Sequence, residues 1–291
     1  MQKLKVEFKD DNKNLTTYLT SKFPELKVNT VYKTLRKKDI KINGKRINDN
    51  VKVHAGDELE IYITDDILYG THKADIPVIY EDDNILVFNK PANLEVEGDN
   101  SLTSIMQKKY KNIYACHRID RNTTGIVLFA KSTDVFDKVV EMFRNDEIEK
   151  HYIACCYGLP KSNATANAYL FKDRKKSIVY ITKEPKKGAS KIQTSYKLID
   201  ENKEKNVSIL DVTLHTGKTH QIRAHLAFLG LPIIGDGKYG SYEINKRFKT
   251  KTQLLASYSI KFNLKNDYGE LNYLNDKEIK LKNIPFTEYL Q

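Results

Sequence analysis

From residue 76 onward, the predicted strands and helices of the chain do not alternate regularly, and this order constrains the fold more than any other feature. Alternating and β-branched apolar runs predict strands over 85–89, 126–130, 152–157, 194–199 and 208–214. Apolar residues at helical spacing predict helices over 134–144 and 220–229. Because a doubly wound parallel sheet needs a helix between successive strands, we exclude it and predict one α+β domain over 76–291.

Residues 1–63 predict a smaller α/β domain. Apolar residues at i, i+4 and i+8 from Leu15 indicate one helix, and Val31 with Leu35 indicates a second short one. The pair Asn43-Gly44, between β-branched residues, predicts a tight hairpin. A turn and an alternating strand follow it. Residues 64–75 are short and irregular, which is typical of a linker.

Basic residues are concentrated in this first domain. Residues 30–54 carry eight lysines and arginines against two aspartates. This density favours contacts with nucleic-acid phosphates, and the alternative is a small basic domain with no nucleic-acid role. The residues that we expect to bind RNA are Arg36, Lys37, Lys38, Lys41, Lys45 and Arg46.

The whole chain is basic as well, with a formal net charge of +11 and a sequence pI of about 9.2. The charge favours a polyanionic partner, although a generic lysine-rich surface would produce it too. Only eight of the 49 basic residues are arginine. Since the planar arginine fork suits bidentate contacts that lysine cannot make, the positions of these arginines are informative.

The cellular compartment is predicted from the apolar runs, the first residues and the cysteines of the sequence. No apolar run approaches the ~18 residues that span a bilayer, and charged residues follow the first six directly, without a signal-peptide core. Cys116, Cys155 and Cys156 form no CxxC pair, so we expect inert thiols. We expect a cytoplasmic monomer with no membrane partner.

The string His-Arg-Ile-Asp-Arg-Asn-Thr-Thr-Gly over 117–125 holds the strongest candidate for chemistry. Asp120 lies between Arg118 and Arg121, in a polar loop that leads into an apolar strand. Neighbouring guanidinium groups favour the ionised carboxylate that a nucleophile or base requires, and they also suit a substrate that carries phosphates. A loop salt bridge with no catalytic role is the alternative.

A second string, over 214–226, predicts a helix with one polar side chain of interest. Thr219 is the expected N-cap, and Ile222, Leu226 and Leu229 form the buried stripe. Arg223 is therefore expected near the helix start, on a different face from the stripe.

Three other types of site are weaker. A phosphate-binding loop ending in Gly217-Lys218-Thr219 fails, because Val212 stands where its first glycine is needed. The five-residue spacing of His215, His220 and His225 differs from the spacing of four that helical zinc motifs use. The acidic pair Asp82-Asp83 precedes a strand and indicates a solvated turn rather than the magnesium site of a nuclease.

Tyr152 is an aromatic residue at the polar boundary of an alternating strand. It is either an ordinary core residue or a platform on which an unpaired base stacks.

Together, these strings resemble the RluA-type pseudouridine synthases. Residues 117–126 match the signature around that family's catalytic aspartate, 150–154 match Lys-x-Tyr-x-Ala, and 216–226 match Thr-Gly-Arg-Thr-His-Gln-Ile-Arg-x-His-Leu with lysine for the first arginine. Asn89-Lys90-Pro91 and Gly235-Asp236 match two further segments. The chain departs at Asn122 and at Leu255, where the family has an acid and a histidine, and we expect neither change to abolish activity.

The first domain resembles the alpha-L (S4-like) RNA-binding domain, on the strength of Leu35-Arg36-Lys37 and the Asn-Gly-Lys-Arg run at 43–46. With the family resemblance, it implies an RNA-modifying enzyme. The implied catalytic domain has a central mixed, mainly antiparallel sheet flanked by helices.

The resemblance also implies the roles in the site. Asp120 is the nucleophile, either by adding to the sugar or by abstracting a sugar proton, Tyr152 stacks on the base and Arg223 pairs with Asp120. The other expected substrate-binding residues are Ile222, Arg118 and Arg121.

No metal or cofactor is expected. The expected partner is RNA, with large-subunit ribosomal RNA first and transfer RNA second. The alternative from another class is a non-catalytic RNA-binding assembly factor, but intact Asp120, Tyr152 and Arg223 argue against it.

Overall fold

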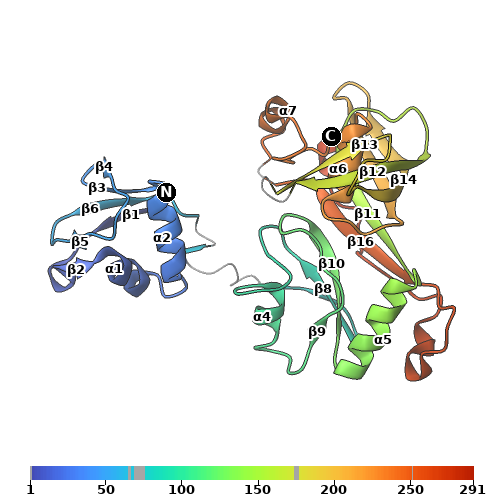
Figure 1. The fold of residues 1–291 in the computed structure, drawn as a ribbon, viewed down its shortest axis with the longest axis horizontal. Helices are drawn as coiled ribbons and strands as arrows, with labels where there is room; N and C mark the ends of the chain where they lie inside the picture. The colour runs from blue at the N-terminus through green and yellow to red at the C-terminus, as the bar shows by residue number, and fades with distance from the viewer. Residues whose placement is uncertain (1, 65–66, 69–75, 174–176, 251) are drawn as a thin grey trace. The chain divides into compact units, whose positions relative to one another are not determined.

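The structure, a computed structural model, describes all residues except 1, 65–66, 69–75, 174–176 and 251. The chain divides into two compact units, Met1–Asp75 and Ile76–Gln291, each with its own hydrophobic core (Figure 1). The predicted linker over 64–75 falls mostly outside the described residues. Among the described residues, no helix combines the length and hydrophobicity needed to cross a bilayer.

Among its described elements, the N-terminal unit has helices α1 (Leu15–Lys22) and α2 (Val28–Arg36) and two small sheets. Helices α1 and α2 confirm the two predicted helices. The larger sheet has the order β1-β6-β3-β4, with bounds Gln2–Lys5, Glu58–Ile61, Ile40–Ile42 and Lys45–Arg46. The smaller sheet pairs β2 (Lys13–Asn14) with β5 (Lys52–Val53), and a short 3-10 helix covers Phe8–Asp10.

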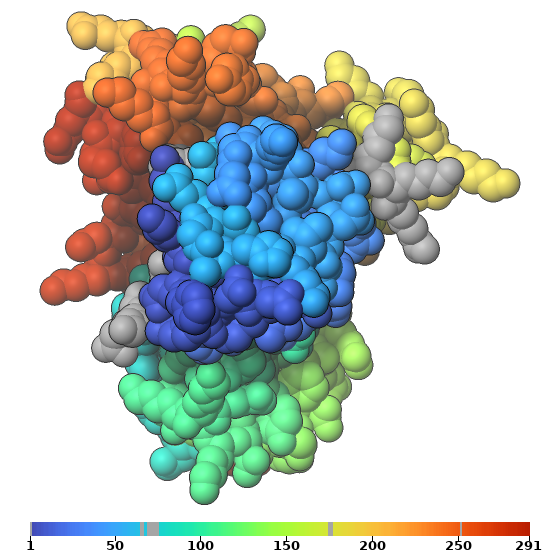
Figure 2. Space-filling model, turned by 90° about the vertical axis from the view of Figure 1, so that its left-hand side faces the viewer, coloured from blue at the N-terminus to red at the C-terminus, as the bar shows by residue number. Residues whose placement is uncertain are grey.

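The predicted hairpin joins β3 to β4. Asn43 and Gly44 have positive φ angles of 50° and 77°, as a two-residue hairpin turn requires. Leu15, Val31 and Leu35 are fully buried in the core of this unit. Figure 2 shows one face of this unit, coloured blue to cyan, in space-filling form.

The C-terminal unit is built on one mixed, mainly antiparallel sheet of eleven strands. Its main path is β13-β12-β14-β15-β11-β16-β10-β8-β7, with bounds Ile178–Thr182, Ala164–Asp173, Ser190–Asn202, Val207–Leu214, Ile148–Tyr157, Leu255–Phe262, Thr124–Ala130, Ile85–Lys90 and Val78–Glu81. Strands β9 (Tyr114–Ala115) and β17 (Glu278–Lys280) pair with β10 and β16. The five predicted strands and the α+β class are confirmed.

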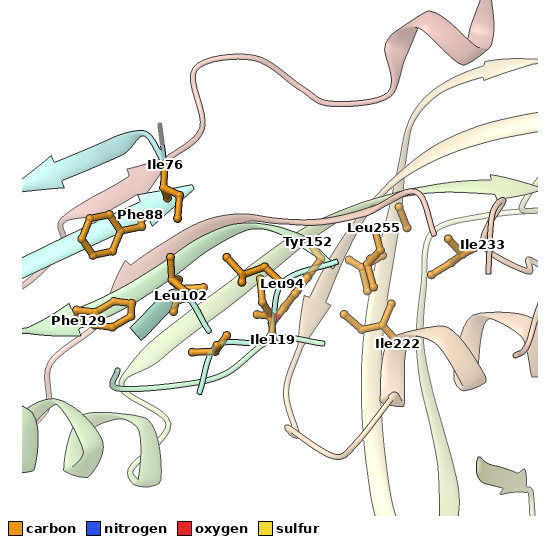
Figure 3. Packing of buried hydrophobic residues seen from close by; sticks show 14 of the residues in the cluster. Ile76, Phe88, Leu94, Leu102, Ile119, Phe129, Tyr152, Ile222, Ile233 and Leu255 are labelled. Carbon is orange, nitrogen blue, oxygen red and sulfur yellow. The ribbon is translucent and has the colours of Figure 1, made fainter. Parts of the chain in front are cut away.

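Helices and short 3-10 segments cover both faces of this sheet. On one face, α4 (Leu102–Met106) and α6 (Gln221–Phe228) pack on alternate residues of the central strands, among them Phe88, Phe129 and Tyr152 (Figure 3). On the other face lie α5 (Thr133–Arg144), α7 (Tyr242–Arg247) and the 3-10 segments Gly269–Leu274 and Thr287–Leu290.

A glycine permits the parallel pairing of β10 with β16, the one parallel pair among the described strands. Gly125 has φ of +102°, and a Cβ atom on it would lie 2.1 Å from the backbone oxygen of Ser257. Only glycine therefore allows the two strands to meet where the loop of Asp120 enters β10.

Candidate active site

The loop between β9 and β10 carries Asp120 and is held on both sides. The backbone N–H of Thr123 donates to the Asp120 carbonyl at 3.0 Å, which closes a tight turn. On one side, Gln253 Nε2 donates to Thr123 Oγ1 at 2.7 Å. On the other side, Lys90 Nζ donates to the carbonyl of Arg121 at 3.0 Å. These bonds hold the backbone on which Asp120 sits.

Lys90 is a fully buried lysine whose ammonium donates to three backbone carbonyls. Besides Arg121, it donates to Pro91 and Leu94 at 2.9 and 2.7 Å. Burial lowers the pKa of Lys90 to about 7. Three carbonyl acceptors satisfy its three donors, so Lys90 ties the end of β8 to the Asp120 loop.

Arg223, from the first turn of α6, joins two aspartates. Its Nη1 donates to Asp120 Oδ2 at 2.9 Å. Its Nε and Nη2 donate to the two carboxylate oxygens of Asp236 at 2.7 and 3.0 Å. Arg223 therefore makes the contact with Asp120 that the resemblance implied, and Asp236 takes the other edge of the fork.

Asp236 was not given a role by sequence reasoning, although its segment matched the family. Its side chain is 0% exposed, against 8% for Arg223 and 28% for Asp120. Its Oδ1 also accepts from the backbone N–H groups of Lys238 and Tyr239. Burial opposes the charge of Asp236, but the Arg223 contacts outweigh it and lower its pKa. Burial likewise opposes the charge of Arg223, while Asp236 and Asp120 raise its pKa.

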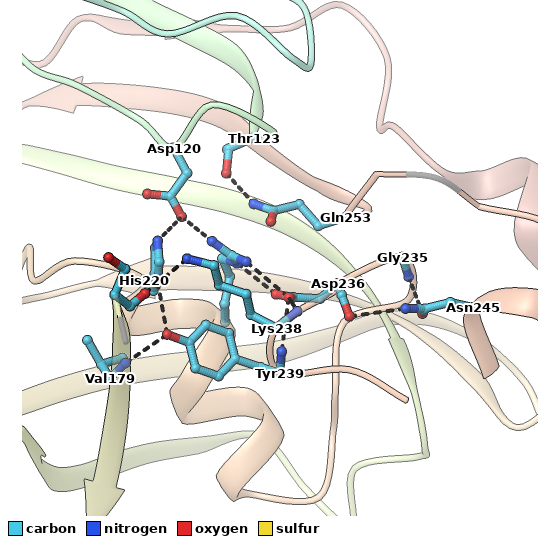
Figure 4. Close-up of polar contacts among 12 residues, drawn as sticks. Asp120, Thr123, Val179, His220, Gly235, Asp236, Lys238, Tyr239, Asn245 and Gln253 are labelled. Atoms are coloured by element: carbon cyan, nitrogen blue, oxygen red, sulfur yellow. Dashed lines mark hydrogen bonds and ion pairs between the residues drawn. The ribbon is translucent and has the colours of Figure 1, made fainter. Parts of the chain in front are cut away.

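His220 lies beside this ion pair. Its Nε2 is 3.9 Å from Asp120 Oδ2, and its Nδ1 is 2.9 Å from the Tyr239 hydroxyl, which accepts from Val179 N–H (Figure 4). Burial lowers the pKa of His220, which favours the neutral ring. The prediction that Thr219 caps α6 is wrong. The N-cap is His220, in the left-handed conformation with φ of 53°, and the turn preceding the helix aims this side chain at Asp120.

Asp120, Arg223 and His220 line a cavity of about 530 Å³, within the range of small-molecule sites. The predicted substrate-binding residues Tyr152, Ile222 and Arg118 line it too. Tyr152 is almost fully buried and packs in the core, as the first of its two descriptions predicted, while its role as a base-stacking platform stays a prediction. Burial and then the charge of Asp120 raise the pKa of its hydroxyl, which keeps the ring neutral.

The remaining predicted residues lie elsewhere. Arg121 does not line the cavity, and its Nε donates to the carbonyl of Asn93 at 3.1 Å. Leu255, where the family has histidine, lines the cavity with an apolar side chain. The basic residues of the first domain belong to the N-terminal unit.

No metal site is formed by the described residues. Among them, no group of three His, Cys, Asp or Glu side chains converges. His215 is within hydrogen-bond distance of Ser195, and His225 is buried next to Thr194. Asp82 accepts from the backbone N–H groups of Asn84 and Ile85, the turn that was predicted. All three cysteines are free and buried.

The chain is similar to proteins of known description. Residues 84–228 match a family model described as RNA pseudouridylate synthase. A Mycoplasma capricolum protein described as an uncharacterized RNA pseudouridine synthase is 32% identical, over 96% of this chain and 97% of that protein. Ribosomal large subunit pseudouridine synthase C of Buchnera aphidicola is 30% identical, over 89% and 88%. The solved human RNA pseudouridylate synthase domain containing 1 has a TM-score of 0.62 at 20% identity, over 75% of this chain and 86% of that one, and supports the fold alone.

Proposed function

Because the chain belongs to the RNA pseudouridine synthase family, whose members are isomerases acting on RNA, we propose that it isomerises specific uridines with Asp120 as the nucleophile. The observation that carries this proposal is the position of Asp120. Its carboxylate lines the cavity, and Arg223 donates to one of its oxygens, Oδ2. The second oxygen, Oδ1, is available to the substrate.

The reaction breaks the C1′–N1 bond of uridine and forms a bond from C1′ to C5 of the same ring. The hydrogen on C5 leaves as a proton, and N1 gains a proton, so atoms and electrons balance without an oxidant or reductant. No cofactor is needed for this exchange. Asp120 Oδ1 either adds to the sugar carbon or removes a sugar proton, and both steps use the same ionised oxygen.

The cavity wall suits the turn of the detached base. Tyr152 and Ile222 offer flat and apolar surfaces on which uracil can rotate while it stays enclosed. Arg223 holds Asp120 in place, and Asp236 holds Arg223. The target nucleotide must leave any helix to enter, at a cost of a few kcal/mol that contacts with flanking phosphates offset.

We propose large-subunit ribosomal RNA as the substrate. The support is the description of the Buchnera relative, a ribosomal large subunit enzyme that this chain matches over most of its length. Pseudouridines mapped in ribosomal and transfer RNA, from cells with and without the protein, test the substrate. A site lost from large-subunit RNA is the expected result, whereas a loss confined to transfer RNA contradicts it.

For the N-terminal unit we propose RNA binding through its basic cluster. Arg36, Lys37, Lys38, Lys45 and Arg46 are exposed, and Arg46 Nη1 donates to the carbonyl of Lys38, which joins the hairpin to the end of α2. Lys41 differs from the others. It is half-buried and paired with Glu60 at 3.1 Å, so we expect it to contribute less.

The nucleophile is tested by Asp120→Asn. The amide keeps the shape of the side chain and loses the ionised oxygen, so we expect no isomerisation and nearly unchanged RNA binding. Tritium release from RNA containing 5-tritiated uridine measures the first, and filter binding measures the second. Turnover within tenfold of the wild type would exclude Asp120 as the nucleophile.

A further inference from the structure

One end of the cavity is formed by residues that the proposed chemistry does not use. Cys116, His117, Phe143 and Lys150 line it, together with the exposed Arg118. Lys150 is on β11, two positions before Tyr152, so the two residues lie about 7 Å apart along the strand. The side chains of both line the same cavity.

Lys150 is a half-buried cation that lines the cavity next to an aromatic ring. Burial lowers its pKa, and its Nζ lies 5.4 Å from the centre of the Phe143 ring. It forms no ion pair with any carboxylate of the described residues, and Asp146 acts on it only through its more distant charge.

Besides the cation Arg118, two further titratable groups lie at this end, and both are neutral. Burial, and then the charge of Lys150, lower the pKa of His117 to about 3, and its Nε2 accepts from the backbone N–H of Leu128 at 3.0 Å. Burial raises the pKa of the Cys116 thiol to about 12. Neither group can neutralise Lys150, so the cavity keeps an uncompensated positive charge next to the wall formed by Tyr152.

We propose that Lys150 binds a backbone phosphate next to the target uridine, in a subsite of the cavity that is separate from the base site. This inference rests on the proposed function. A cation held partly away from water is stabilised when an anion joins it, and the anion that an RNA substrate brings is its phosphodiester. When the base lies against Tyr152, the sugar–phosphate chain has to leave the cavity. The end of the cavity that contains Lys150 lies two residues away along β11.

The test asks whether the effect of changing Lys150 depends on one particular phosphate of the RNA. The substrate is the shortest large-subunit ribosomal RNA fragment that the full-length wild type modifies, carrying 5-tritiated uridine. Uncharged methylphosphonates replace the linkages on either side of the target, one at a time. Lys150→Met removes the charge and keeps most of the volume, and Lys150→Arg keeps the charge. Lys161→Met is the matched control, since Lys161 is exposed and does not line the cavity.

We expect Lys150→Met to lower kcat/KM about tenfold on the unmodified RNA. One methylphosphonate should lower the wild-type kcat/KM by a similar factor, and Lys150→Met should then cause no further loss at that linkage. Lys150→Arg should recover part of the rate, and Lys161→Met should leave it unchanged.

The proposal is overturned if, at every linkage, the loss in kcat/KM caused by Lys150→Met multiplies with the loss caused by the methylphosphonate. Lys150 would then contact the base or only support the fold. An unchanged kcat/KM for Lys150→Met overturns it too. The wild type on the unmodified RNA reports the proposed function separately. If the wild type modifies no fragment, both the function and the subsite are contradicted, whereas wild-type turnover with multiplicative losses contradicts the subsite alone.

Discussion

Arg223 shows why one arginine, rather than one of the many lysines, occupies the centre of the site. Its two-pronged edge binds Asp236 through Nε and Nη2, and only Nη1 reaches Asp120. The Tyr239 ring lies 5.2 Å from the guanidinium carbon and covers one face of the group. A lysine has a single nitrogen and no planar fork, so it cannot bind both carboxylates in this geometry.

Arg223→Lys should therefore reduce turnover strongly and lower the melting temperature, with little effect on RNA affinity. Two carboxylates would be left underpaired in a site that is largely closed to water, and losing one partner of such a pair typically costs about 3–5 kcal/mol. Single-turnover rates at saturating enzyme measure the effect. Arg247→Lys, at an exposed arginine on α7, is the matched control and should be silent. A near-normal rate for Arg223→Lys would mean that Arg223 does not support Asp120.

The sequence indicated Asp120 and Arg223 because each belongs to a local string that matches a family signature. Their roles remain predictions, but the structure does bring the two side chains together. Asp236 could not be assigned in this way, since its contact with Arg223 depends on the path of the loop after α6. Gly235 has φ of +82°, and a Cβ atom on it would lie 2.0 Å from the Thr252 oxygen, so glycine before Asp236 is a signal of close packing.

At the scale of elements, the strands predicted from the sequence are those in which apolar residues alternate with polar ones or form a continuous run. Strand β12 (Ala164–Asp173) was missed because alanine, asparagine and lysine dilute its pattern. Strand β16 was missed because it is mixed in composition, although it lies between β10 and β11 in the sheet. Its place depends on pairing with strands more than 100 residues earlier, and a local pattern carries no information about such a partner.

The β11–β15 pairing includes a pH-dependent contact. His151 Nδ1 is 2.9 Å from Asp211 Oδ1 on β15, and its Nε2 is 2.7 Å from Glu149 Oε1. The hydrogen bond with Asp211 is the main cause that raises the pKa of His151 in the folded protein. The stabilisation is therefore fully present below the ordinary histidine pKa of about 6.5 and is lost as pH rises through the folded-state pKa.

His151→Gln tests this contact. At pH 6 the variant should unfold at a lower urea concentration than the wild type. Its free energy of unfolding should be lower by about 0.5–1 kcal/mol, as for a partly exposed pair, and this difference should shrink by pH 9. Urea unfolding curves at both pH values measure it. A difference that stays constant, or grows with pH, would mean that the protonated imidazole does not stabilise the β11–β15 pairing.

At the scale of the whole molecule, two separately packed units divide the proposed work. The C-terminal unit contains the cavity with Asp120, and the N-terminal unit carries exposed basic residues at the end of α2 and in the β3–β4 hairpin. Phosphate contacts act additively on the salt dependence of binding, so the contribution of the N-terminal unit can be measured without knowing how the two units are arranged.

Deleting residues 1–70 should leave a folded C-terminal unit, because that unit has its own core and sheet. Binding to long structured RNA should weaken, and the plot of log affinity against log salt should become shallower by about 0.9 for each phosphate contact that is lost.

A full-length variant with glutamine at Arg36, Lys37, Lys38, Lys45 and Arg46 should reproduce most of this change, while glutamine at the paired Lys41 alone should change the slope little. Since turnover of a short fragment depends on the cavity, it should survive in both the deletion and the five-residue variant. A slope equal to that of the wild type would show that the basic cluster does not touch RNA, and the N-terminal unit would then need another role.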